Sequence, residues 1–275
     1  MSGHDRSAGP VGRTPGRSGP AERVVVPLSG GLDSAVVAAL AAGSGADVVA
    51  VSYRYGQRHA RELLAAEAIA AWVGAVEHHV VDVALSAWDG SRLTRGAVGD
   101  DDADDADDAE DHAPDHDEDA ATRYYVPGRN TVFISLAMSL AEARGAVAVH
   151  LGFTAADVHY PDTGPEYLRL MRALAALTTS TQARPGGVEI HAPLIGLDKV
   201  AIVRQALELG VPVERTWSCY EGGARPCGRC GACRVRDLAL IRSGRPELAT
   251  DEGRAAYAGA AARTSDAVWR FLLRD

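Results

Sequence analysis

The fold of this chain follows from one hexad, Ser29-Gly30-Gly31-Leu32-Asp33-Ser34. The hexad comes directly after Arg23 to Leu28, whose centre is an uninterrupted run of valines. Such a β-branched run is typical of a parallel strand that is buried on both faces. An alanine- and valine-rich stretch from Ala35 to Ala42 follows and predicts a helix. The hexad is therefore the turn that leads from a strand into a helix.

A helix that begins beside two glycines offers a site for an anion. The first N–H groups of a helix lack intrahelical partners, the helix dipole is positive there, and glycines add no Cβ atoms that would hold a phosphate away. The alternative is a plain turn in which Asp33 or Ser34 only caps the helix. The hexad resembles the pyrophosphatase loop, Ser-Gly-Gly-x-Asp-Ser, of the ATP-pyrophosphatase superfamily. That resemblance implies that ATP is split into AMP and pyrophosphate to activate a carboxylate or carbonyl oxygen.

Composition and charge narrow the classes of protein. A length of 275 residues suits one α/β domain with an appendage, or two small domains. The net charge of −9 argues against bulk binding to nucleic acid or to an anionic membrane. Thirteen acidic residues and no Lys or Arg lie between Asp100 and Asp119, which leaves the rest of the chain close to +4. A mildly basic remainder suits an enzyme that handles ATP and an acidic substrate.

Apolar runs and cysteines indicate the compartment. No stretch approaches the roughly 18 consecutive apolar residues of a membrane span, and the first twenty residues lack the apolar centre of a secretion signal. All four cysteines lie between Cys219 and Cys233, a spacing that indicates a metal site before disulfides in a reducing compartment. We therefore expect a cytoplasmic protein.

The chain divides into three parts by composition. Residues 1–22 are rich in Gly, Pro, Ser and Arg, and we expect a disordered tail. Residues 23–212 are expected to form the ATP-pyrophosphatase α/β domain, and residues 213–275 a zinc-binding C-terminal module. An acidic insertion at about 86–122 interrupts the first of these. We expect a solvated, disordered segment there, with a divalent-cation sponge or a lid as alternatives.

Strand-like and helix-like stretches alternate along the α/β part. This alternation predicts a doubly wound parallel sheet with ligands beyond the carboxyl ends of the strands. The resemblance to ATP-pyrophosphatases implies that the sheet is adenine-nucleotide alpha-hydrolase-like. Further strands are expected at Asp47–Tyr53, Ala75–Val83, Val147–Gly152 and Val188–His191, and further helices at Ala60–Val73, Thr131–Arg144, Pro165–Leu177 and Leu197–Leu209.

The strongest second signal is a set of four cysteines. Four thiolates can surround one tetrahedral Zn²⁺ at about 2.3 Å, and such a closed site is structural. Glycines inside the short loops allow the tight turns of a zinc knuckle. The alternative is an iron–sulfur cluster, which also uses C-x-x-C spacings. The expected ligands are Cys219, Cys227, Cys230 and Cys233.

The chain resembles the 7-cyano-7-deazaguanine synthase family from Val24 to about Arg236, apart from the acidic insertion. The matching pieces occur in the family's order, and together they are highly specific. One departure is Thr163, where the family usually has cysteine. The pieces are the hexad, Tyr55 to His59 with Glu62, Pro127 to Asn130, Tyr160 to Asp162, Pro193 and Leu194 with Lys199, and Thr216 to Tyr220 leading into the last three cysteines.

This resemblance implies an ATP-dependent ligase that forms carbon–nitrogen bonds in queuosine or other deazapurine biosynthesis. The substrates would be 7-carboxy-7-deazaguanine, ammonia and ATP with Mg²⁺, and the nitrile would form through an acyl adenylate and an amide. The resemblance also implies a homodimer. From the cysteine spacing we expect one structural zinc per chain, and from the charge and the apolar runs no membrane and no nucleic-acid partner. Alternatives are a tRNA-thiolating ATP-pyrophosphatase, an amide-forming 7-deazaguanine synthase, and a non-catalytic zinc-bearing RNA-binding protein.

The hexad and its neighbours are the candidates for handling ATP. Asp33 is expected to bind Mg²⁺ or to orient the loop, while Lys199 and Arg129 neutralise developing phosphate charge. For Lys199 the alternative is plain surface charge near a helix end. The backbone and side chains expected to hold the phosphates are Leu28, Ser29, Gly30, Gly31, Leu32, Asp33 and Ser34.

Two further groups are candidates for the other substrates. His59 and Glu62 lie three apart on one helical turn and would serve ammonia or phosphate, with an ordinary surface pair as the alternative. Asp162 would accept two hydrogen bonds from the N1–H and amino edge of a guanine-like base. Tyr160 and Asn130 complete the expected substrate-binding set.

Overall fold

One parallel sheet forms the centre of the protein. In the computed structural model, the described residues are 21–56, 60–87, 125–180, 186–221 and 223–261. The sheet has five strands in the order β3-β2-β1-β4-β5, and every neighbouring pair is parallel. The strands are β1 Arg23–Pro27, β2 Asp47–Arg54, β3 Glu77–Asp82, β4 Ala148–His150 and β5 Glu189–His191.

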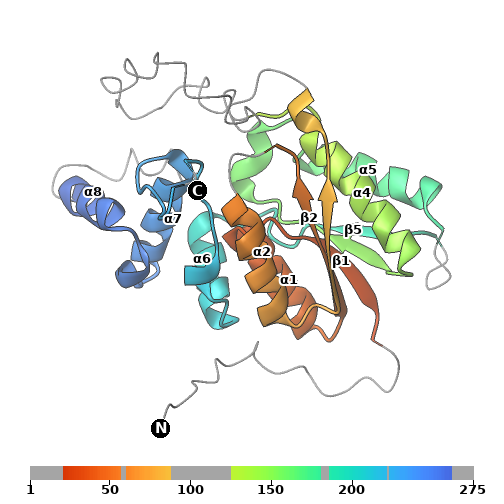
Figure 1. The fold of residues 1–275 in the computed structure, drawn as a ribbon, viewed down its shortest axis with the longest axis horizontal. Helices are drawn as coiled ribbons and strands as arrows, with labels where there is room; N and C mark the ends of the chain where they lie inside the picture. Colours follow the sequence, from red (N-terminus) through yellow and green to blue (C-terminus); the bar gives the residue numbers. More distant parts are fainter. Residues whose placement is uncertain (1–20, 57–59, 88–124, 181–185, 222, 262–275) are drawn as a thin grey trace, which may run out of the picture.

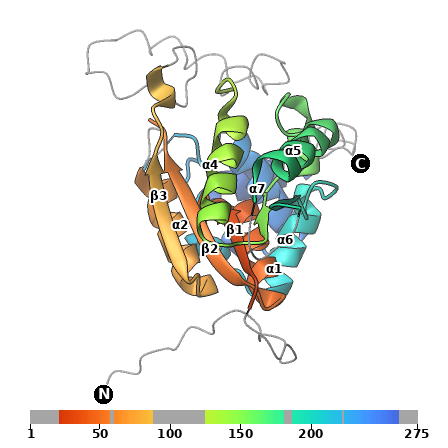
Figure 2. The same cartoon turned by 90° about the vertical axis from the view of Figure 1, so that its right-hand side faces the viewer.

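Helices cover both faces of this sheet. α1, α2 and α6 pack on one face, while α4 and α5 pack on the other (Figure 1), and α4 lies in front of β1 and β2 in Figure 2. The prediction of a doubly wound parallel sheet is therefore confirmed. The helices are α1 Leu32–Gly43, α2 Ala60–Val73, α4 Arg129–Ala143, α5 Pro165–Thr178, α6 Lys199–Glu208, α7 Gly231–Arg242 and α8 Asp251–Ala261, with short 3₁₀ turns η1 Leu85–Ala87, η3 Ala155–His159, η4 Val213–Arg215 and η5 Pro246–Leu248.

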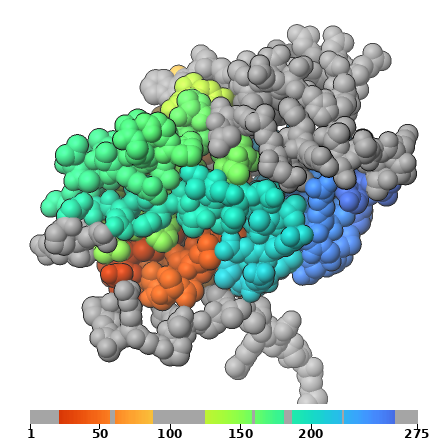
Figure 3. Space-filling view, turned by 180° about the vertical axis from the view of Figure 1, so that it is seen from behind, coloured from red at the N-terminus to blue at the C-terminus, as the bar shows by residue number. Residues whose placement is uncertain are grey.

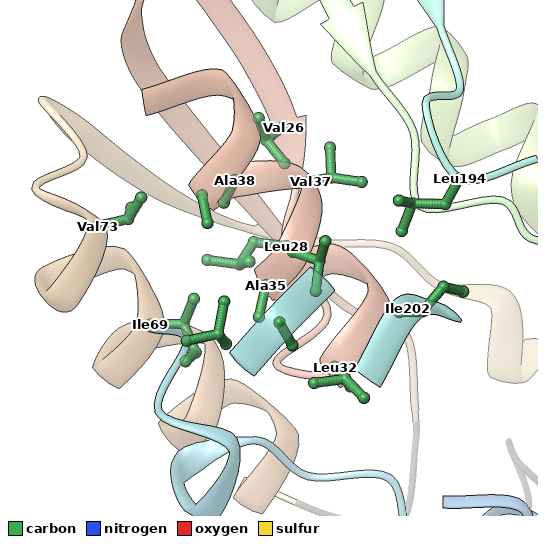
Figure 4. Packing of buried hydrophobic residues seen from close by; sticks show 14 of the residues in the cluster. Val26, Leu28, Leu32, Ala35, Val37, Ala38, Ile69, Val73, Leu194 and Ile202 are labelled. Atoms are coloured by element: carbon green, nitrogen blue, oxygen red, sulfur yellow. The ribbon is translucent and has the colours of Figure 1, made fainter. Parts of the chain in front are cut away.

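The valine run of β1 explains why both faces are covered. Val24 and Val26 point into the core beneath α1, α2 and α6, while Val25 points into the core beneath α4 and α5. All three are buried, because successive side chains of a strand alternate between faces. Leu28 and Leu32 continue the first core past the end of the strand, among side chains from α1, α2 and α6 (Figure 4). Apolar anchors thus fix the hexad at both ends.

The C-terminal helices pack beside α6. Leu240 of α7 belongs to the same buried cluster as Ile202 of α6 and Val213 of η4. Seen from behind in Figure 3, the cyan α6 region lies between the green residues of the α5 region and the blue C-terminal helices. The division into residues 23–212 and 213–275 stays a prediction. In the part of the chain that the structure describes, no helix has the length and apolar character needed to cross a bilayer.

Several element ends differ from the sequence prediction for local reasons. α1 begins at Leu32 instead of Ala35, since the second half of the hexad is already helical. α6 begins at Lys199 instead of Leu197, because the Asp198 carboxylate accepts the Ala201 N–H at 2.7 Å and caps the helix. β4 ends at His150 instead of Gly152. Most of the predicted tail, the acidic insertion and His59 lie outside the described residues.

Candidate active site and metal centre

The hexad forms a tight loop between β1 and α1 that is braced by its own side chains. Ser34 is buried; its Oγ accepts the Ser29 N–H at 3.2 Å and donates to the Gly31 carbonyl at 3.0 Å. The Ser29 Oγ in turn accepts the Gly31 N–H at 3.2 Å. The first helical bond runs from Ala35 N–H to Gly31 O, so the Leu32, Asp33 and Ser34 amides precede it. This is the arrangement of an anion site at a helix N-terminus.

Gly30 is required by a close approach of the loop to α2. It adopts φ +82°, and a Cβ there would lie 2.3 Å from the Glu62 carbonyl oxygen and 2.8 Å from the Ala66 amide nitrogen. Gly31 caps α1 with an ordinary φ of −75° and no side-chain cap. Asp33 and Ser34 lie inside α1, so neither is the cap that the plain-turn alternative assigned to them.

Asp33 and Lys199 meet at the carboxyl edge of the sheet, between α1 and α6. The Lys199 Nζ donates to both carboxylate oxygens of Asp33, each at 2.7 Å. The Lys199 side chain is 19% exposed and the Asp33 side chain 28% exposed, so the pair is half-buried. Asp33 lies in the first turn of α1 and Lys199 in the first turn of α6, and both helices start beyond the carboxyl ends of strands. The structure thus brings together two residues that the sequence placed in the phosphate site.

Asp157 is a third charged group near this pair, and sequence reasoning missed it. Its Oδ2 accepts both the backbone N–H and the hydroxyl of Thr154 at 2.8 Å, which closes the η3 turn. Burial raises the pKa of Asp157, and the Asp33 charge raises it further, while the bonds from Thr154 and the Lys199 charge lower it. The capping box, Thr154 followed three residues later by Asp157, was the available sequence signal.

The end of β4 reaches the same place. A Cβ on Gly152 would lie 3.3 Å from the Ser34 amide nitrogen and 3.6 Å from the Asp33 carbonyl carbon. β1 and β4 are neighbours whose chain connections leave in opposite directions, which makes their carboxyl ends the switch point of the sheet. Ligands of open α/β sheets bind at such a point.

A second polar cluster joins α2 to α4. The Arg129 guanidinium lies over the Tyr55 ring, 5.9 Å from its centroid. Burial raises the pKa of Glu62 to about 7, and the Arg129 charge opposes that rise. Glu62 is therefore close enough to Arg129 to sense its charge. The predicted partner of Glu62 was His59, which lies outside the described residues.

Asn130 pairs with the buried carboxylate of Asp162. Asp162 is only 6% exposed, and its two carboxylate oxygens accept the Asn130 backbone N–H at 3.0 Å and side-chain amide at 3.1 Å. This remote cap explains why α4 starts at Arg129, two residues before the predicted start. Any hydrogen bond from a base edge would have to use the remaining lone pairs of this carboxylate.

Tyrosines surround the segment that follows η3. Tyr160 stacks on Tyr125, with ring centroids 6.0 Å apart and planes 12° apart. Burial raises the pKa of both Tyr160 and Tyr220, and each also senses nearby charges from this region. Thr163, where the family usually has cysteine, is buried, and its hydroxyl lies within hydrogen-bond distance of the Tyr160 and Asp157 carbonyls. The hydroxyl thus braces this segment.

The four predicted cysteines come together. Their Sγ atoms all lie within 4.8 Å of one another. Four sulfurs on a tetrahedral Zn²⁺ at about 2.3 Å would stand about 3.8 Å apart, so the cluster fits such an ion. Backbone N–H groups also face the sulfurs: Glu221 and Cys227 donate to Cys219 Sγ at 3.4 Å, and Cys230 donates to Cys227 Sγ at 3.3 Å. Such bonds stabilise thiolates, the form that binds metal.

Two of the residues expected to hold ATP, Leu28 and Leu32, do not face the site with their side chains. The Leu28 and Leu32 side chains are buried in the core. The Leu28 N–H donates to Val51 O at 2.7 Å, and its carbonyl accepts the Ser52 hydroxyl at 2.6 Å. Leu28 therefore anchors the loop, and Leu32 offers its amide.

Known proteins are similar to this chain over most of its length. The family model of the queuosine biosynthesis protein QueC matches residues 23–244. A 7-cyano-7-deazaguanine synthase from Microcystis aeruginosa is 49% identical over 230 residues, which cover 83% of this chain and 95% of the relative. One from Synechococcus elongatus is 49% identical over 233 residues, covering 84% and 96%. Among solved structures, NMN synthetase from Francisella tularensis gives a TM-score of 0.44 at 16% identity, covering 87% of each chain.

Proposed function

Because the chain belongs to the QueC family of queuosine biosynthesis proteins, we propose that it converts 7-carboxy-7-deazaguanine and ammonia to 7-cyano-7-deazaguanine with ATP. Relatives of nearly half-identical sequence carry the name of that synthase, and they match over most of both chains. The observation that carries the proposal is the Asp33–Lys199 pair, which joins the hexad to the start of α6. The pair would offer a carboxylate to Mg²⁺ and a cation to phosphate.

The chemistry explains why an ATP site is needed. A carboxylate is a poor electrophile because its oxygen is a poor leaving group. When a carboxylate oxygen attacks the α-phosphorus of ATP, the α–β phosphoanhydride bond breaks and pyrophosphate leaves. Ammonia then attacks the acyl carbon, AMP departs with the oxygen, and an amide remains. The amide oxygen takes a second AMP in the same way, and loss of that AMP with two N–H protons leaves the nitrile.

The hexad would hold the phosphate that leaves. The Gly30, Gly31 and Leu32 amides supply N–H donors at the positive end of α1. The Ser29 hydroxyl, which now accepts the Gly31 N–H, can turn to donate to a phosphate oxygen. Ser34 braces the loop from its buried position.

Lys199 and Asp33 would exchange partners when Mg–ATP binds. The carboxylate of Asp33 would coordinate Mg²⁺, which frees the Lys199 ammonium for the phosphate oxygens. Charge that develops on the leaving pyrophosphate is then met by a fixed cation, which is the largest kind of catalytic contribution in such sites. Asp157 senses the charges of Asp33 and Lys199, and it would help to orient Lys199.

The second cluster would serve the other substrates. Arg129 would bind phosphate or the substrate carboxylate, and Glu62, with its raised pKa, would accept a proton from ammonium at neutral pH. His59, three residues before Glu62 in the sequence, would assist. Tyr160 would stack on the deazaguanine ring, and Asp162 with Asn130 would recognise its edge.

The cysteine cluster would hold one structural Zn²⁺. When bound, the ion joins the ends of the knuckle and converts binding energy into folding energy. All four thiolates would be used, so the thiolating alternative, which needs a sulfur-carrying cysteine or an open iron, has no candidate among them. We also propose a homodimer, on family resemblance alone.

Product analysis tests the proposal. The purified protein is incubated with 7-carboxy-7-deazaguanine, ATP, Mg²⁺ and an ammonium salt, and products are identified by mass spectrometry. The expected products are the nitrile, AMP and pyrophosphate. An amide alone would favour the amide-forming alternative, and no ATP consumption would refute the assignment.

A further inference from the structure

Arg236 is a buried cation whose donors serve the backbone of another segment. It lies on α7, three residues after the last cysteine, and is 7% exposed. Its Nη1 donates to the Thr216 carbonyl at 3.0 Å and its Nη2 to the Val213 carbonyl at 2.7 Å. Removing a guanidinium from water costs free energy. The two hydrogen bonds offset part of that cost, and they fix the position of the backbone that accepts them.

The segment that Arg236 holds leads directly to the hexad. The Thr216 backbone N–H and hydroxyl also bond to the Val213 carbonyl, at 3.1 Å and 2.7 Å, and close the η4 turn. The next residue, Trp217, donates its backbone N–H to the Gly30 carbonyl at 2.8 Å. Its indole N–H donates to the Cys219 carbonyl at 3.1 Å, which ties it to the first cysteine as well.

The bond from Trp217 fixes the direction of an N–H group in the phosphate loop. In a planar trans peptide, the carbonyl of one residue and the N–H of the next point in opposite directions. With the Gly30 carbonyl held toward Trp217, the Gly31 N–H must point to the other side of the peptide, where it now meets Ser29 Oγ. Gly30 has no side chain of its own, so the orientation of this peptide depends on its neighbours: the α2 backbone, the Ser29 hydroxyl and the Trp217 amide.

We propose that Arg236 is a positioning residue of the phosphate loop. It holds the turn before Trp217, the Trp217 amide holds the Gly30 carbonyl, and the Gly31 N–H is thereby aimed at the pyrophosphate of ATP. The cysteine module would then orient the ATP site as well as stabilise the chain. This inference rests on the proposed function, in which the hexad binds pyrophosphate.

A purely structural arginine would change stability alone, so the test follows ligand affinity. Arg236→Met removes both donors and keeps an apolar stem. Arg234→Met is the matched control, since Arg234 is an exposed arginine on the same helix. For both variants in the metal-loaded state, we would measure bound metal, the thermal midpoint, pyrophosphate affinity by calorimetry, and KM for each substrate.

Arg236→Met is expected to weaken pyrophosphate binding about tenfold and to raise KM for ATP by a similar factor. Bound metal and KM for 7-carboxy-7-deazaguanine should stay at the wild-type values, and Arg234→Met should match the wild type throughout. Pyrophosphate affinity unchanged in Arg236→Met would overturn the inference and leave the proposed function standing. Wild-type protein that binds neither pyrophosphate nor ATP would overturn both.

A milder variant keeps the test valid if Arg236→Met does not fold. Thr216→Val removes the hydroxyl bond to Val213 with little change of shape. It is expected to weaken pyrophosphate binding about two- to threefold, since one of the hydrogen bonds that hold the turn is lost and the others remain. Wild-type affinity in this variant would contradict the role of the turn.

Discussion

Adding one methyl group to either glycine of the hexad should separate folding from ligand binding. Gly30→Ala and Gly31→Ala are the same chemical change at adjacent positions. A Cβ at Gly30 would lie 2.3 Å from the Glu62 carbonyl oxygen, whereas a Cβ at Gly31 would find its nearest neighbour, Ser29 Oγ, at 3.2 Å. We therefore expect Gly30→Ala to disturb the fold and Gly31→Ala to disturb the phosphate site.

The size of the first effect follows from two terms. Holding alanine at a positive φ costs about 1–2 kcal/mol, and moving the loop away from the α2 backbone adds strain of about the same size. A loss of about 3 kcal/mol would lower the thermal midpoint of a protein of this size by about 10 °C. Gly31 has an ordinary φ, and the contact with a hydroxyl is relieved by a small rotation. The thermal midpoint of Gly31→Ala should therefore differ from the wild-type value by less than about 2 °C.

Calorimetry and pyrophosphate titration check this pair of variants. Gly31→Ala should fold normally but bind pyrophosphate about tenfold more weakly, because the methyl group stands beside the N–H donors. Equal midpoints for the two variants would refute the account of the Gly30 contact. Undiminished affinity in Gly31→Ala would refute the placement of the ligand.

Three other variants test single groups. Lys199→Met should lower kcat at least about a hundredfold with little loss of stability, while the exposed Arg204→Met on the same helix should match the wild type; equal kcat values would exclude Lys199 from catalysis. Glu62 has a pKa raised from 4.5 to about 7, so its neutral form stabilises the fold below pH 4.5 and that stability is lost as pH rises through 7. The free energy of unfolding of Glu62→Gln should therefore exceed that of the wild type by about 3 kcal/mol at pH 8 and match it near pH 4, and a difference that does not change with pH would contradict the burial effect. Cys230→Ser or a strong chelator should release one zinc per chain and lower the thermal midpoint, whereas iron with sulfide in the purified protein would identify the cluster alternative.

Local sequence patterns predicted much of the fold. The valine run of β1 and the limits of α2, Ala60–Val73, agree with the prediction because burial and periodicity are local properties of the sequence. The start of α4 differs because its cap, Asp162, comes from a segment more than thirty residues later, which no local pattern contains. The start of α6 differs although its cap, Asp198, stands directly before it, and the N-cap preference of aspartate would have found it.

For the candidate site too, local motifs could be predicted from the sequence, whereas contacts between distant segments could not. The hexad and the cysteine spacings are compact motifs whose chemistry is visible in sequence. Contacts between distant residues are not visible in sequence. Lys199 meets Asp33 only because α1 and α6 begin at the same edge of the sheet. Arg236 gave no signal in the sequence, since only its burial distinguishes it from the exposed Arg234 on the same helix.

The most direct test of the central claim follows the oxygen atoms of the substrate. The protein is given 7-carboxy-7-deazaguanine labelled with heavy oxygen in the carboxylate, together with unlabelled ATP, Mg²⁺ and ammonium, and the products are analysed by mass spectrometry. If each oxygen is activated by transfer to AMP, both labels must appear in AMP, one per molecule, with none in pyrophosphate. Label in pyrophosphate or water, with unlabelled AMP, would contradict adenylation as the step that this site performs.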